Sequence, residues 1–220
     1  MSNAIKNYND LVLAVKELAE DVGTELEAYM PTAIDNAELR LTREVNGLDL
    51  VYTSSIVVAA STPNFTKPAG HLVTYQVTYT DPNTNKSVPL EKKTDSYLDA
   101  YWPQATSVGS PKYYTELDRN TFRIAPACSN ASYFKIRGER RPPVLSSANQ
   151  TNVFTSTMPN MLFYATMMEV AMWQRNFELL SVFEGQYVAA RDGIATEGER
   201  AKDDDGTVNS GTNTLSNAGK

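Results

Sequence analysis

The first part of the chain carries apolar residues at the spacing of a helix. They recur at steps of four, three and four, and they are Leu11, Val15, Leu18 and Val22. Such steps place side chains on one helix face. Asn7 or Asn9 is expected to cap this helix at its start, and Gly23 is expected to end it.

A second amphipathic helix is predicted to follow. Thr24 and Glu27 have the spacing of a capping box, and Pro31 falls where a first helical turn tolerates proline. The apolar stripe of this helix is Ile34, Ala37, Leu41 and Val45, and the helix is expected to stop at Asn46-Gly47. The charged residues beside the stripe are expected on a solvated or inter-subunit face.

The middle of the chain changes to a period of two. Residues 72–80 read LVTYQVTYT, with Val73, Tyr75, Val77 and Tyr79 on one face and threonines and Gln76 on the other. This alternation predicts a half-buried strand. Residues 81–86 have turn chemistry, and residues 87–92 are expected to return as an edge strand because they contain Pro89. Residues 54–60 are a third predicted strand.

A short helix and three further strands are predicted next. Thr94 is a suitable cap for the helix, and Pro103 closes it. Residues 111–118, 120–127 and 132–143 are strand-like runs with turn residues between them, which predicts a meander.

The last third of the chain returns to helical spacing. Residues 161–173 are apolar nearly all round, which predicts a buried helix, and their methionines are interpreted as adaptable core filling rather than a soft-metal face. A thinning apolar stripe predicts another helix over 177–203, roughly 40 Å long, whose end protrudes or lies on another chain. Residues from Asp203 onward contain no aromatics and are expected to order only on a partner.

These elements predict an α+β fold. A helical core is expected from the N- and C-terminal helices, with a small antiparallel β region inserted between them. The expected organisation is one structural domain made of N-terminal helices (1–47), a β-rich insertion with one short helix (48–145), C-terminal core helices (146–203) and a flexible arm (204–220).

Composition narrows the function classes. The chain of 220 residues has a net charge of −6 and a sequence pI of about 4.9. Proteins that grip DNA phosphates usually carry a basic surface, so DNA is expected to pass this chain without sequence-specific binding. No apolar stretch approaches the roughly 20 residues of a membrane helix, and the first residues do not read as a secretion signal.

The residues offer little to an enzyme or a metal site. Cys128 is the only cysteine and His71 the only histidine, and both are expected to have structural roles. Walker, GxGxxG, GxSxG and HExxH motifs are missing. Asp95 and Asp99 are acids only four residues apart on a predicted helix. We therefore expect no catalytic residue, no cofactor and no bound metal.

Several segments in a fixed order resemble a known family. The strongest are AELRLTREVN at residues 37–46 and a run that contains Pro159, Leu162, Tyr164, Ala165 and Glu169. Together with residues 9–21, 97–118 and 132–147, they resemble the tailed-bacteriophage adaptor proteins, also called head-to-tail connector or head-completion proteins, of the short-tailed-phage type. Val170 stands where a small residue is expected, and residues 52–92 look elaborated.

The resemblance implies a structural virion protein in the neck, assembled in the host bacterial cytoplasm. Members typically form a ring of twelve copies below the portal, extend the DNA channel and offer the tail a docking surface. The implied partners are the portal protein, a tail or nozzle protein and further copies of the chain, with genomic DNA passing through. No membrane partner is expected.

Two sets of residues are candidate contact sites. The C-terminal segment is expected to dock on the portal through Thr196, Glu199, Arg200, Lys202, Asp203, Asp204, Asp205 and Leu215. Contacts between subunits are expected at Glu38, Arg40, Arg43 and Glu44 and at the basic run Lys135, Arg137, Arg140 and Arg141, with passing DNA as a second candidate contact of the basic run. A frayed terminus and solvated surfaces are the alternative interpretations.

Two other functions remain open. The chain fits another neck or tail-completion protein. It also fits a β-rich module that binds a carbohydrate or receptor through an aromatic surface made of Tyr75, Tyr79, Tyr97, Tyr101, Trp102, Tyr113 and Tyr114. Packing within the sheet and its core is the alternative role of these aromatics.

Overall fold

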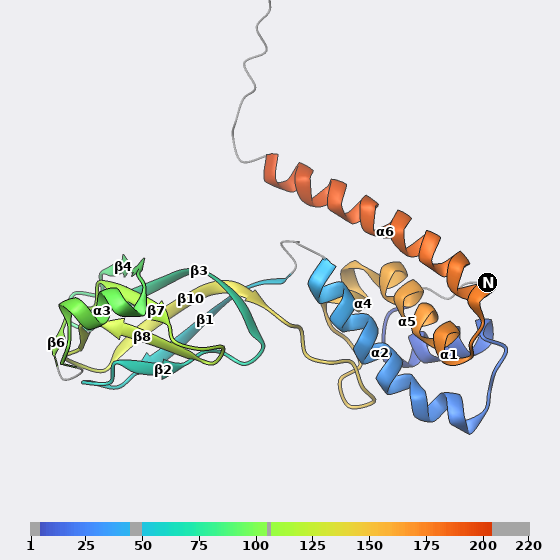
Figure 1. The fold of residues 1–220 in the computed structure, drawn as a ribbon, viewed down its shortest axis with the longest axis horizontal. Helices are drawn as coiled ribbons and strands as arrows, with labels where there is room; N and C mark the ends of the chain where they lie inside the picture. Colours follow the sequence, from blue (N-terminus) through green and yellow to red (C-terminus); the bar gives the residue numbers. More distant parts are fainter. Residues whose placement is uncertain (1–4, 45–49, 105–106, 204–220) are drawn as a thin grey trace, which may run out of the picture.

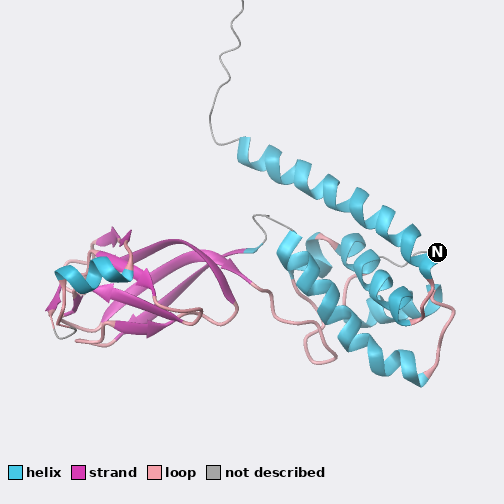
Figure 2. Cartoon of the chain, in the orientation of Figure 1, coloured by secondary structure: helices cyan, strands magenta, loops and turns pink. Residues whose placement is uncertain are grey.

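The protein has two lobes, side by side along the long axis of the molecule (Figure 1). The computed structural model describes residues 5–44, 50–104 and 107–203. One lobe is helical, and the other consists mainly of strands (Figure 2). The chain starts in the helical lobe, builds the β lobe, and returns to the helical lobe after residue 140.

The helical lobe is built around one central helix. Its helices are α1 (Tyr8–Leu18), α2 (Thr24–Glu44), α4 (Val153–Thr157), α5 (Pro159–Trp173) and α6 (Phe177–Asp203). The apolar helix α5 packs against the other four, as its lack of a polar face requires. The largest side chains buried completely in this lobe include Leu11, Leu26, Ile34, Leu41, Phe154 and Leu162.

The helix boundaries partly follow the predictions. The Asn7 side chain accepts a hydrogen bond from the Asp10 amide at 2.9 Å, which confirms it as the cap of α1. That helix ends at Leu18 rather than at Gly23, so Val22 lies beyond the stripe and is 86% exposed. Pro31 lies inside α2 rather than in a first turn. The predicted stop at Asn46-Gly47 falls outside the described residues. The long C-terminal helix over 177–203 is confirmed.

The described part of the β lobe contains three sheets. Its strands are β1 (Val51–Val58), β2 (Asn64–Thr66), β3 (His71–Thr80), β4 (Ser87–Pro89), β5 (Glu91–Lys92), β6 (Val108–Gly109), β7 (Tyr113–Glu116), β8 (Thr121–Ala125), β9 (Ala127–Cys128) and β10 (Ser132–Arg140). Sheet A has the order β1-β10-β3-β4, sheet B the order β2-β8-β7-β5, and β6 pairs with β9. The short helix α3 (Asp95–Tyr101), capped by Thr94, lies beside β7.

The predicted fold, a helical core with a small antiparallel insertion, is wrong. The β lobe has its own hydrophobic core, in which Phe122, Phe134 and Ile136 are completely buried. The pairs β5–β7 and β6–β9 are parallel, and β10 leaves the predicted meander to pair between β1 and β3. Residue periodicity predicts strands but not their partners. The partners are chosen by burial between segments that lie far apart in sequence.

The apolar face predicted for strand β3 is buried only in the second half of the strand. Val77 and Tyr79 are buried, whereas Val73 and Tyr75, predicted on the same face, are exposed. The pairing of β3 with β10 shifts register between Arg137 and Gly138 and again after Glu139. Such a bulge adds a residue to one strand and therefore changes which face the following side chains occupy.

Candidate assembly surfaces

Glu38 was predicted on a solvated or inter-subunit face of α2, and the structure corrects this. The side chain is 2% exposed and faces the segment that returns from the β lobe. Its carboxylate accepts hydrogen bonds from the Leu145 amide at 3.2 Å and from the Asn152 side-chain amide at 2.5 Å. Burial raises the pKa of Glu38, and the two hydrogen bonds partly offset this rise. Glu38 therefore holds the returning segment against α2 within one chain.

Arg141 ties the two lobes together. Its guanidinium binds Asp35 of α2 at 2.5 Å, and its backbone amide donates to the carbonyl of Gly70 in the β lobe at 2.8 Å. Asp35 and Glu38 are three residues apart and therefore share one face of α2. Arg140 instead lies over the ring of Tyr52 at 5.3 Å. Arg141 is therefore engaged within the chain, whereas Arg140 stays exposed.

The C-terminal end of α2 is engaged by α5 and α6. Arg40 pairs with Glu169 at 3.1 Å, and Glu44 accepts a hydrogen bond from the Tyr187 hydroxyl at 2.9 Å. Burial, followed by the Glu44 hydrogen bond, raises the pKa of Tyr187. Arg43 is exposed and forms no ion pair among the described residues.

Lys135 and Arg137 of the basic run are exposed on the outer face of sheet A. They alternate along β10 with Phe134 and Ile136, which point into the β-lobe core. Together with Thr53, Gln76, Thr78 and Ser87 they line a shallow depression of about 420 Å³ on the outer face of sheet A. Two cations and three hydroxyl groups therefore meet in this depression, and none of its lining side chains is buried.

The helix α6 leaves the helical lobe at its C-terminal end (Figure 1). Phe183 and Tyr187 are buried in its first half, whereas Thr196 is exposed and donates back to the Asp192 carbonyl at 2.9 Å. Of the other predicted portal-docking residues, Glu199, Arg200, Lys202 and Asp203 lie in α6. Their side chains, like the whole of Asp204, Asp205 and Leu215, are outside the described part of the chain.

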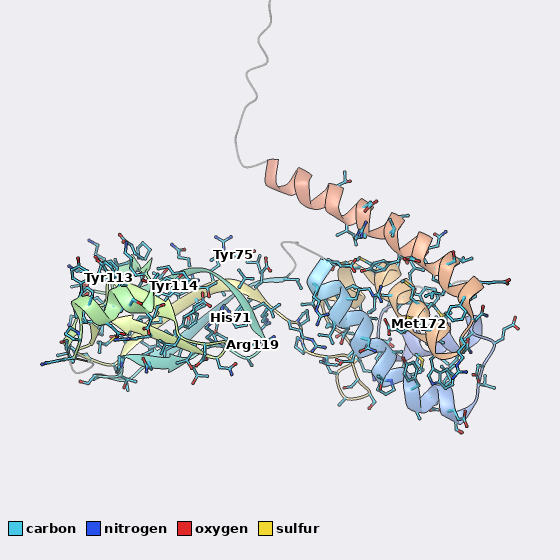
Figure 3. All side chains as sticks on the ribbon, in the orientation of Figure 1. His71, Tyr75, Tyr113, Tyr114, Arg119 and Met172 are labelled. Atoms are coloured by element: carbon cyan, nitrogen blue, oxygen red, sulfur yellow. The ribbon has the colours of Figure 1, made fainter. Side chains whose placement is uncertain are left out.

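The predicted aromatic surface divides into three places. Tyr79 and Tyr114 are buried in the β-lobe core, and Tyr75 lies on β3 with its hydroxyl on Glu139. The other four meet around α3: Tyr97 lies 5.7 Å from Tyr113, and Trp102 lies 5.4 Å from Tyr113. Figure 3 shows Tyr113 near α3 and Tyr75 apart from it. The sequence could not separate these groups, because burial across sheets decides them.

The remaining side chains considered as candidates for chemistry are buried or are bound to other side chains of the same chain. His71 is buried between the Tyr52 hydroxyl at 2.6 Å and the Thr74 hydroxyl at 2.8 Å, and Cys128 is buried. Asp95 and Asp99 both bind Arg123. The described residues contain no cluster of three side chains able to hold a metal ion. Within the same part of the chain, no helix is long and apolar enough to span a membrane.

Comparison with known proteins identifies the family. The model of the SU10 adaptor protein family matches residues 6–213, nearly the whole chain. The chain belongs to this family. The resemblance to phage adaptors is thereby confirmed, and the protein is a bacteriophage structural adaptor of the virion. No curated protein matches the chain. Sequence reasoning missed the contact of Asp35 with Arg141 and that of Asn152 with Glu38, because the residues of each pair are more than 100 positions apart.

Proposed function

We propose that this SU10-family adaptor forms a ring that joins the portal to the tail and continues the DNA channel. Ring, portal, tail and passing DNA are inferences from family membership together with the shape of the chain. The observation that carries the proposal is α6. Its 27 residues would span about 40 Å, and the buried residues among its described side chains, Phe183 and Tyr187, both lie in its first half.

A helix that outruns its own core needs another partner for its end. The residues from Thr196 to Leu215 combine acidic and basic groups, which suits docking by charge complementarity and by ordering on contact. The portal is the partner we assign to this arm. The copies in the ring, proposed to be twelve, would each present one arm.

Deletion of residues 204–220 tests the portal contact. The truncated protein should bind the portal of the same phage at least about tenfold more weakly in a pull-down titration, with an unchanged circular dichroism spectrum and thermal unfolding midpoint. The matched control is a variant in which residues 204–220 keep their composition in scrambled order. Full portal binding by the truncated protein, together with no ring in electron micrographs of wild-type chain and portal, would exclude the function.

A carbohydrate- or receptor-binding function is the second candidate, and one observation favours it. Tyr97, Tyr101, Trp102 and Tyr113 form a partly exposed cluster beside Lys93, whose ammonium lies 5.6 Å from the Tyr97 ring. Aromatic faces of this kind suit stacking on sugars or peptides. A glycan array should show binding that Tyr101→Ala removes and Tyr75→Ala retains. An array without hits excludes the carbohydrate role.

A further inference from the structure

The outer face of sheet A is polar, cationic and uncovered by any described element. Antiparallel pairing aligns its side chains in rows across β1, β10 and β3: Thr53, Arg137 and Gln76 in one row, Ser55, Lys135 and Thr78 in the next, and Val57, Tyr133 and Thr80 in the third. The two cations are two residues apart on β10, about 7 Å along the strand. The face is therefore a continuous surface with charge in its centre.

The two cations of this face have no acidic partner in the described chain. Lys135 and Arg137 form no ion pair among the described residues. Glu139 lies further along the same side of β10, but its carboxylate accepts the Tyr75 hydroxyl. A cationic centre with hydroxyls around it is suited to receive carboxylates from outside.

An exposed apolar pair adjoins the cations. Val57 is 59% exposed and Tyr133 is 58% exposed, and they are direct partners across β1 and β10. Cross-strand partners lie side by side, so the pair forms one small apolar patch one row from Lys135. Tyrosine and arginine are both enriched at protein interfaces. The face thus offers a partner both apolar area and positive charge.

The corner between α1 and α2 has the complementary composition. Leu18 and Val22 are exposed there, and Val22 has almost no contact within its own chain. Glu17, Glu20 and Glu25 surround them and are exposed. These three acids have no ion-pair partner among the described residues, whereas Glu27 nearby is paired with Lys16 at 3.1 Å.

We propose that the outer face of sheet A of one copy binds the α1–α2 corner of the next copy. Tyr133 and Val57 pack on Leu18 and Val22, and Lys135 and Arg137 face the acids of the corner. The two surfaces lie in different lobes of the elongated molecule (Figure 1). A contact between two different surfaces repeats from copy to copy and closes into a ring when the rotation allows it. This inference rests on the ring of the proposed function.

DNA is the competing occupant of the cationic face. Phosphates would bind Lys135 and Arg137, but they would leave Val57 and Tyr133 without an apolar partner. Two cations also neutralise only about two phosphates, which supports weak binding at physiological salt. A second copy of the chain offers partners to both the cations and the apolar patch of this face. Its exposed Leu18 and Val22 supply the apolar area, and its acids supply the negative charge.

Charge reversal on either surface tests the contact. Lys135→Glu with Arg137→Glu on the full chain, or Glu17→Lys with Glu20→Lys, should each lower ring formation on the portal at least about tenfold in mass photometry. The four substitutions together should restore it, because the charges are exchanged rather than removed. Lys112→Glu with Arg119→Glu is the matched control in the β lobe and should leave rings unchanged.

Cysteine cross-linking tests the same contact without a closed ring. A mixture of Val22→Cys and Tyr133→Cys chains should form a disulfide-linked heterodimer, whereas Val22→Cys with Leu117→Cys should not. Cross-linking without rings would retain the contact and reject the proposed ring. Wild-type ring yield in both reversal variants would reject the contact and retain the ring. Loss of binding to a 30-base-pair duplex by Lys135→Glu/Arg137→Glu, with rings intact, would assign the face to DNA.

Discussion

Glu38 and Glu116 are carboxylates whose surroundings shift their pKa values in opposite directions. Burial dominates at Glu38 and raises its pKa. Burial also acts to raise the pKa of Glu116, but hydrogen bonds and charges from Lys67 and Lys92 outweigh it and lower the value to about 2. The two residues therefore contribute to stability in different pH ranges.

Replacement of Glu38 should weaken the attachment of the segment that returns from the β lobe to α2. Glu38→Ala leaves the Leu145 amide and the Asn152 side chain without their acceptor, which should cost about 3 kcal/mol in the free energy of unfolding. Urea denaturation of both proteins at pH 7 measures this loss. Glu27→Ala, at an exposed position of the same helix, is the control and should change stability by under about 1 kcal/mol. Equal effects of the two substitutions would contradict the role of Glu38.

The pH dependence of Glu38 has a definite sign. Its folded pKa lies above the ordinary 4.5, so the folded state binds the proton more tightly. The stability that Glu38 contributes should rise as pH falls through the folded pKa and level off below about 4.5. The difference in unfolding free energy between wild type and Glu38→Gln should therefore grow on acidification. A difference that grows toward alkaline pH would refute this.

Glu116 should show the opposite trend. Its pKa of about 2 in the folded state lies below the ordinary 4.5, so its contribution is fully present above 4.5 and is lost as pH falls toward 2. The stability advantage of wild type over Glu116→Gln should shrink between pH 4.5 and 2. Denaturation curves across this range provide the measurement, and a constant advantage would show that Lys67 and Lys92 do not hold the carboxylate.

At the scale of elements, the bulged pair β3–β10 depends on a glycine. A Cβ added at Gly138 would lie 2.1 Å from the Val73 carbonyl oxygen, a contact with backbone that cannot move aside easily. The same register shift turns Val73 and Tyr75 outward. Strand alternation alone predicts neither fact, because it assumes an unbroken register.

Alanine substitution at Gly138 and at Gly185 should change stability in opposite directions, because the first glycine is needed for close packing and the second only lowers helix propensity. Gly138→Ala should destabilise the protein by more than about 2 kcal/mol because sheet A must shift. A Cβ added at Gly185 in α6 would have no neighbouring atom within 4 Å. Gly185→Ala should therefore stabilise the helix by up to about 1 kcal/mol. Thermal unfolding followed by circular dichroism compares the two. A stable Gly138→Ala protein would show that the two strands can separate without cost.

At the scale of the whole molecule, the two lobes have separate hydrophobic cores. One contains Leu162 and Phe154 among the helices, and the other contains Phe122 and Phe134 among the strands. The contacts between lobes described above are polar: Arg141 on Asp35, and Arg141 on the carbonyl of Gly70. An adaptor built in this way can present different surfaces to different neighbours from one chain.

A cavity in one lobe should therefore loosen mainly that lobe. Leu162→Ala removes a completely buried side chain of α5 and should cost about 3–5 kcal/mol. Hydrogen exchange measured by mass spectrometry should accelerate in α1, α2, α5 and α6 while β3 and β10 keep their protection. Equal acceleration in both lobes would show that the chain unfolds as one cooperative unit.

The helices were the most predictable part of the molecule. The Asn7 cap, the buried α5 and the bounds of α6 follow from local spacing and capping, which are encoded within a few residues. The family was also recognisable from ordered segments, because their residue patterns are local. The extent of the β lobe and the location of Glu38 were mispredicted, because both depend on partners far away in sequence.

The sequence by itself therefore determined the helices, the absence of recognisable catalytic motifs and the kinship with phage adaptors. Only the tertiary structure decided which charges remain available to other chains. Arg141, Glu38 and Arg40 are consumed inside the chain, whereas Lys135 and Arg137 stay on an open sheet face. The physical reason is that a charged side chain is available to another chain only when folding brings no partner from its own chain to it. That condition depends on the packing of elements and not on the residue type.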